Sequence, residues 1–120
     1  YDLLSVATYD TRAFGKNGWP AQTQLAWPIL GVRHFSDIKR SLLLDAAASL
    51  NLVKGTAERL LENIRRRAVQ VAEALYAEVE AENAKVVSLR PELAPVFAGE
   101  AHCLRSILHG VLKDMSRQVA

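Results

Sequence analysis

The sequence predicts a mainly helical domain of the α+β class, in which a short extended or hairpin lead-in precedes a bundle of about three to four helices. Two observations indicate this. Residues 1–35 contain both tryptophans together with Gly15, Gly18, Pro20 and Pro28, and they show no helical period. Across residues 36–120, apolar residues recur every three or four positions, as one face of a helix requires. We therefore expect a single domain over 1–120, with an extended segment at 1–35 and a helical subdomain at 36–120.

The lead-in is predicted as two short extended runs joined by a turn. The runs "LLSVATY" (3–9) and "QLAWPILGV" (24–32) are apolar stretches bounded by turn residues, which is typical of strands. Between them, "FGKNGWP" (14–20) combines Gly and Asn, which tolerate positive φ, with a Pro that cannot continue a helix. Because Pro28 has no N–H to donate, we expect the second run to be an edge strand or to contain a bulge.

The first helix is expected to begin after Ser36, which is a suitable N-cap residue. Asp37 follows it and suits the positive end of the helix dipole. Apolar residues then recur at fourfold spacing to residue 50. Asn51 and the pair Lys54-Gly55 are predicted to end this helix.

Two further helices are predicted beyond this point. The first is long and runs from Thr56 to about Asn83. The stretch "SLRPELAP" (88–95) interrupts the chain, with one helical turn beginning at Pro91, and the last helix covers residues 100–118. The predicted apolar stripe of the long helix consists of Leu60, Leu61, Ile64, Ala68, Val71, Leu75 and Val79.

These apolar stripes are interpreted as core-facing, because most helices owe their stability to the packing of an apolar face. The alternative is a surface that docks a partner helix. Trp19 and Trp27 lie near turns and are also interpreted as core residues, with ligand binding as the alternative.

Composition excludes several classes of protein. Of the 120 residues, 50% are hydrophobic and 23% charged, as in an ordinary globular protein. Since no apolar run approaches the roughly 20 residues that span a bilayer, and no signal peptide is recognisable, we expect a cytoplasmic protein that does not enter a membrane. Cys103 is the only cysteine, which excludes an intrachain disulfide and a cysteine-built zinc site.

Three groups of residues resemble sites, but each has a simpler interpretation: a solvated face for the arginines, and buried or surface side chains without a ligand for the histidines and the cysteine. Arg65 to Arg67 could contact phosphate, but consecutive helical residues fan over about 200°, so a solvated face is favoured. His102 and His109 are two turns apart, roughly 10.5 Å along the axis, which is too far for one metal ion. Cys103 has no marked base beside it and is not expected to be a nucleophile.

The order of segments resembles the C-terminal region of HipA-family proteins, the serine/threonine kinase toxins of bacterial toxin–antitoxin systems. The resemblance is carried by "YDLLSV" (1–6), "QLAWPILGV" (24–32), the helix "SDIKRSLLLDAAASLNL" (36–52) and a long helix that includes "RRRAVQVAEALYAEV" (65–79). It spans essentially the whole chain, with its sharpest parts at 1–5 and 25–31. The departures from the family pattern are Gln24, Trp27 and the pair Leu30-Gly31.

The resemblance implies one site residue. Asp2 matches the aspartate of the family's Tyr-Asp segment, which binds magnesium as the DFG aspartate of ordinary protein kinases does. A carboxylate is a suitable ligand, because Mg²⁺ prefers oxygen donors and often takes only one or two carboxylates beside phosphate oxygens. No catalytic residue is assigned to this chain.

The resemblance also implies a parent kinase that uses ATP and Mg²⁺ to phosphorylate serine or threonine of a protein whose identity the sequence does not indicate. In the family, the phosphate loop, the nucleotide-binding lysine and the catalytic aspartate precede the Tyr-Asp segment. We therefore expect this chain to be a fragment of a longer kinase and to be inactive alone. The implied partner is a HipB-like antitoxin, through which DNA would be contacted indirectly. The alternative is a non-catalytic helical interaction or oligomerisation module, and a weaker alternative is direct DNA binding through Arg65 to Arg67.

Overall fold

The structure, a computed structural model, describes residues 7–120. Asp2, the expected magnesium ligand, lies outside the described residues. The described chain is mainly helical with one two-stranded antiparallel sheet, which confirms the predicted fold class. Its elements are 3₁₀ turns at Ala7–Asp10 and Arg12–Phe14, strands β1 (Gln24–Ile29) and β2 (Val32–His34), a 3₁₀ turn at Phe35–Asp37, helices α1 (Arg40–Ser49) and α2 (Lys54–Leu89), a 3₁₀ turn at Pro91–Leu93, α3 (Ala94–Arg105), a π-helical segment (Ser106–Leu112) and α4 (Lys113–Gln118).

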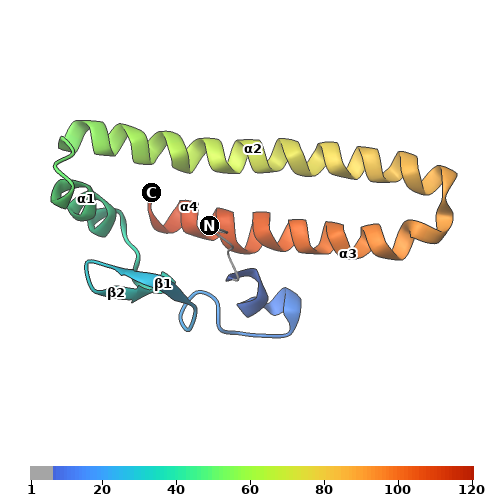
Figure 1. Ribbon diagram of the computed structural model, residues 1–120, viewed down its shortest axis with the longest axis horizontal. Helices are drawn as coiled ribbons and strands as arrows, with labels where there is room; N and C mark the ends of the chain where they lie inside the picture. Colours follow the sequence, from blue (N-terminus) through green and yellow to red (C-terminus); the bar gives the residue numbers. More distant parts are fainter. Residues whose placement is uncertain (1–6) are drawn as a thin grey trace.

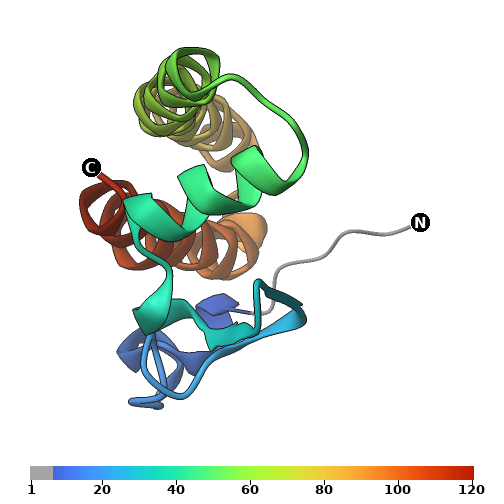
Figure 2. The same cartoon turned by 90° about the vertical axis from the view of Figure 1, so that its left-hand side faces the viewer.

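A long helical hairpin dominates the molecule (Figure 1). The helix α2 runs along one side, and α3, the π-helical segment and α4 return beside it as one continuous helix, because the backbone stays helical at both junctions. The end view shows that the returning helix lies between α2 and the lead-in, while α1 crosses at the side (Figure 2). Gln118 closes this arrangement, since its side-chain amide donates to the carbonyls of Phe35 and Ile38.

The β-hairpin formed by β1 and β2 has a tight turn, which lies within the second predicted run. Ile29 pairs with Val32, which leaves Leu30 and Gly31 as a two-residue loop with φ of 47° and 86°. Positive φ at both positions is the signature of a type I′ turn, whose twist matches that of the strands. The register shifts between Gln24 and Ile29, so the expected irregularity around Pro28 is confirmed.

Two expectations for the lead-in are wrong. Ala7–Asp10 is a 3₁₀ turn and not the end of a strand, because the Thr8 carbonyl accepts from both the N–H and the hydroxyl of Thr11 and closes the chain tightly. Trp27 is not a core residue: it is 84% exposed on β1, since the two-stranded sheet offers it no packed face. Trp19, in contrast, is half-buried and lies against Phe35, with ring centroids 5.1 Å apart.

The first helix begins later than predicted and ends where predicted. Ser36 lies within a 3₁₀ turn with its hydroxyl toward Asp37, so it does not cap α1, which begins at Arg40. At the other end Asn51 has a φ of 60°. The N–H groups of Asn51 and Leu52 donate to the carbonyls of Ala48 and Ala47, which is a Schellman motif.

The other two helices are longer than predicted. The helix α2 begins at Lys54 because the Val53 carbonyl accepts from the N–H groups of Thr56 and Ala57, so the pair Lys54-Gly55 belongs to the first turn of α2 and does not end the preceding helix. The same helix continues past Asn83 to Leu89. The predicted turn at Pro91 is confirmed, and α3 starts directly after it because a proline is tolerated in a first helical turn.

The core is small, and no residue of the predicted core stripe of α2 is fully buried in it. The buried apolar residues in the described range are Ala7, Ile38, Ala57, Leu108 and Val119. On α2, Ile64, Val71 and Leu75 are 63%, 58% and 52% exposed. The returning helix is contacted instead by Arg65 and Asn83, which bond to Ser116 and Glu100 and lie five turns apart on one face. At 100° per residue, the exposed residues point roughly 80–120° away from that face.

Candidate functional site

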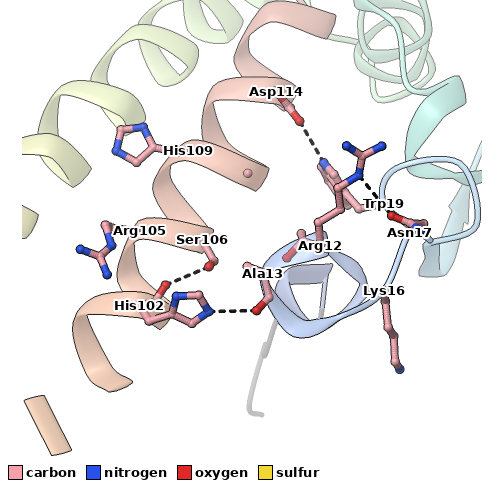
Figure 3. Close-up of a pocket in the computed structure, with 12 residues that line it drawn as sticks. Arg12, Ala13, Lys16, Asn17, Trp19, His102, Arg105, Ser106, His109 and Asp114 are labelled. Atoms are coloured by element: carbon pink, nitrogen blue, oxygen red, sulfur yellow. Dashed lines mark hydrogen bonds between the residues drawn. The ribbon is translucent and has the colours of Figure 1, made fainter. Parts of the chain in front are cut away.

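A cleft of about 600 Å³ lies between the lead-in and the C-terminal helix. One wall is the loop from Thr11 to Trp19, and the other is the α3–α4 helix from His102 to Asp114 (Figure 3). Two hydrogen bonds hold the walls together. His102 Nε2 lies 2.9 Å from the Ala13 carbonyl oxygen, and Trp19 Nε1 donates to Asp114 Oδ2 at 3.2 Å.

The π-helical segment shapes the helical wall of this cleft. It begins at Ser106, whose hydroxyl donates to the His102 carbonyl at 2.8 Å, and it ends where the Lys113 N–H donates to the Leu108 carbonyl, five residues back. Gly110 faces the lead-in, since a β-carbon there would lie 3.6 Å from Thr11 Cγ2. π-Helical turns are frequent at functional sites, so the side chains of this cleft are candidates for binding or catalysis.

The charges of the cleft are mostly positive, but they do not converge. Arg12, Lys16 and Arg105 line it, against the single carboxylate of Asp114. Figure 3 shows Lys16 pointing away from the helix and Arg105 pointing to the other side of it, while Arg12 donates to Asn17 at 3.2 Å. Asp114 already accepts from Trp19 and pairs with Arg117. The cleft therefore presents a diffuse positive potential and no focused anion site.

The cleft also offers no catalytic or metal-binding set. The described residues contain no group of three or more His, Cys, Asp or Glu side chains that could hold a metal ion. His102 and His109 are both exposed, and Figure 3 shows their rings directed to different sides. Cys103 is half-buried. Geometry thus gives no reason to assign general acid, base or nucleophilic chemistry to these side chains.

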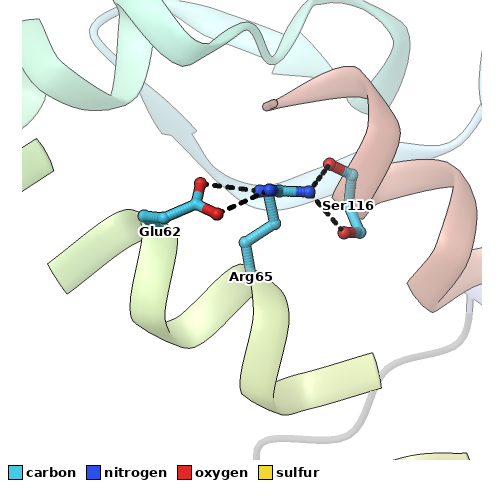
Figure 4. Close-up of polar contacts among 3 residues, drawn as sticks. All are labelled: Glu62, Arg65 and Ser116. Carbon is cyan, nitrogen blue, oxygen red and sulfur yellow. Dashed lines mark hydrogen bonds and ion pairs between the residues drawn. The ribbon is translucent and has the colours of Figure 1, made fainter. Parts of the chain in front are cut away.

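The three consecutive arginines have different surroundings. Arg66 and Arg67 are exposed, as the solvated-face interpretation predicts, but Arg65 is not (Figure 4). Its guanidinium forms a two-point ion pair with Glu62, with Nη2–Oε1 and Nε–Oε2 distances of 2.6 and 3.0 Å, and it also contacts Ser116 on α4. The hydrogen bond to Arg65 lowers the pKa of Glu62, and the same bond raises the pKa of Arg65. Arg65 is a structural clasp between α2 and α4.

A second ion pair strengthens the same interface. Lys113 Nζ lies 2.7 Å from Glu73 Oε1, joining the first residue of α4 to the middle of α2. The hydrogen bond from Lys113 lowers the pKa of Glu73. Both clasps leave the exposed apolar residues of α2 on a different side of the helix.

Those exposed residues form the other surface feature of the chain. We call Leu60, Ile64, Arg67, Val71 and Leu75 the outer stripe of α2. A shallow groove lies along it, and α2 side chains line it: Asn63, Ile64, Arg67, Ala68, Val71, Ala72 and Leu75. The sequence prediction identified the apolar members but placed them in the core. The sequence did contain a signal for this exposure. The helix α2 has apolar residues on two faces, and a single returning helix covers only one of them.

Comparison with protein-family models, curated proteins and solved structures found no match to this chain. Among the described residues, no helix has both the length and the apolar character needed to cross a membrane. The functional assignment therefore depends on the segments of the sequence and on the two surfaces described above.

Proposed function

We propose that this chain is the C-terminal portion of a HipA-like kinase, whose full-length form transfers the γ-phosphate of ATP to serine or threonine of a protein target. The observation that carries the proposal is the ordered set of a Tyr-Asp segment, an apolar hairpin sequence and amphipathic helices. The element order is compatible with it, since the hairpin Gln24–His34 precedes α1 and the long helical hairpin. In this assignment the described residues are a supporting subdomain, and the chain alone is inactive.

In this proposal Asp2 is the residue that would hold magnesium. Its carboxylate belongs to the oxygen-donor class that Mg²⁺ prefers, and in kinases the ion neutralises the charge of the phosphates during transfer. The proposed partner is an antitoxin of the HipB type, with DNA contacted through that partner. The cytoplasm is the proposed location.

The test is the substitution Asp2→Asn in the protein that carries this chain together with its kinase core. We expect the transfer of labelled phosphate from ATP to fall by at least a hundredfold, because removal of a group that stabilises developing charge typically costs that much. Asp37→Asn, a matched substitution at an exposed turn, should leave transfer unchanged. Full activity in the Asp2→Asn protein would contradict the assignment.

A second candidate function is a helical interaction module, and the exposed outer stripe of α2 favours it. An apolar surface of this kind usually marks a binding site. The native protein, purified under mild conditions, should then have a mass greater than that of one chain, and Val71→Glu should reduce it to the mass of one chain. A native protein already at the mass of one chain would contradict this function.

A further inference from the structure

We propose that the outer stripe of α2 is a self-association surface, on which the same stripe of a second copy packs antiparallel. This inference rests on the second proposed function and names its partner. It does not depend on the kinase assignment.

The stripe has the spacing of a helix–helix contact. Leu60, Ile64, Arg67, Val71 and Leu75 follow one another at intervals of four, three, four and four residues, the repeat that brings helices together side by side. From Leu60 to Leu75 the stripe extends for about 22 Å along the axis. Its apolar members are 47–63% exposed, so about half of their surface is unburied within one chain. Packing against another helix would remove that surface from water.

The charges on this face select the orientation. Arg67 lies near the middle of the stripe, and Glu78 and Glu82 continue the same face beyond the C-terminal end of the stripe at Leu75. Arg67 and Glu78 are eleven residues apart, which places them within about 20° of each other around the helix. A parallel copy would oppose Arg67 to Arg67 and Glu78 to Glu78. An antiparallel copy instead opposes each arginine to a glutamate, and twofold symmetry forms this pair twice.

One register packs Val71 and Leu75 together at the centre of the contact and brings opposite charges together beside them. When Val71 lies beside Leu75 of the second copy, position 67 is level with position 79. Arg67 then reaches Glu78 of the second copy, with Glu82 about one turn beyond it. Ala68 and Ala72 line the same groove and are small, so the helices can approach closely. A partner with charge of one sign would repel either Arg67 or Glu78, whereas an antiparallel second copy pairs each of them with the opposite charge.

Charge reversal tests the proposal in the 120-residue chain by sedimentation equilibrium. The chain should be a dimer. Arg67→Glu and Glu78→Arg should each weaken the dimer by about tenfold, since both symmetric pairs become repulsive. The double variant should recover the original dissociation constant, which a merely structural effect would not do. Arg66→Glu makes the same charge change at the adjacent exposed position off the stripe and should have no effect.

Disulfide cross-linking tests the orientation. In a Cys103→Ser background, Arg67→Cys and Glu78→Cys chains are mixed and oxidised. The antiparallel arrangement predicts the mixed disulfide between the two variants. Predominant Arg67→Cys homodimers would overturn the proposal, and so would a chain that remains monomeric at every concentration. A native complex that contains a different protein would overturn self-association while sustaining the second proposed function.

Discussion

Arg65 shows how one side chain joins two helices that are far apart in the sequence. It pairs with Glu62 within α2 and reaches Ser116 on α4, 51 residues away. Three consecutive arginines are visible in the sequence, but which of them faces inward depends on the position of the returning helix. The sequence could therefore predict that they diverge, and it could not predict that Arg65 is the clasp.

Arg65→Lys should lower the thermal unfolding midpoint. Lysine keeps the charge but cannot form the two-point contact with Glu62 while also reaching Ser116. Arg66→Lys is the matched control at the exposed neighbour and should leave the midpoint unchanged. The measurement is circular dichroism at 222 nm during heating. Equal midpoints for both variants would contradict the role of Arg65 as a clasp.

Glu73 should make stability depend on acid pH. Its pKa is lowered from 4.5 in the folded chain by the hydrogen bond from Lys113. A lowered folded-state pKa contributes stability that is present above 4.5 and is lost as pH falls through the folded value. Glu73→Gln should therefore unfold at lower urea concentration near pH 7, and the difference from the unsubstituted chain should vanish well below pH 4.5. An unchanged difference at all pH values would contradict this ion-pair contribution.

At the scale of elements, local sequence explains the type of each element better than its ends. The left-handed residue Asn51 after α1 and the turn at Pro91 were predictable because their residue types favour those backbone conformations. The start of α1 was not, because Ser36 is held in a 3₁₀ turn whose Phe35 carbonyl accepts from distant Gln118. The π-helical segment also has no recognised sequence signal, and it lies where the lead-in packs against the helix.

Leu30 offers a direct test of the hairpin turn. It is a non-glycine residue at φ 47° and is 55% exposed, so it bears left-handed backbone strain without a buried side chain. Leu30→Asn should stabilise the chain by about 1 kcal/mol, because Asn-Gly is the preferred pair of a type I′ turn. Leu30→Ala, which keeps the strain, should not stabilise it. The urea unfolding midpoints of the three proteins provide the measurement.

The whole molecule is longer than a compact chain of its size. Its radius of gyration is 17.2 Å, against about 14 Å expected for 120 residues. The cause is the helix Lys54–Leu89, which exposes one of its two apolar faces. Periodicity predicted both the helix and its stripe, but it could not indicate which face the returning helix covers. The sequence could therefore predict which residues form the outer stripe, but it could not predict that they are exposed.

The dimer predicts a concentration-dependent unfolding midpoint, because association stabilises only the folded chain. For a dimer of two 120-residue chains, each tenfold rise in protein concentration should raise the midpoint by about 3–5 °C. Val71→Glu should abolish this dependence while retaining helix content, since Val71 is already exposed. Val96→Glu, at a position 64% exposed on α3, is the matched control and should retain the dependence. A midpoint independent of concentration in the unsubstituted chain would show that the outer stripe does not join two copies, and Val71→Glu would then have no dimer to disrupt.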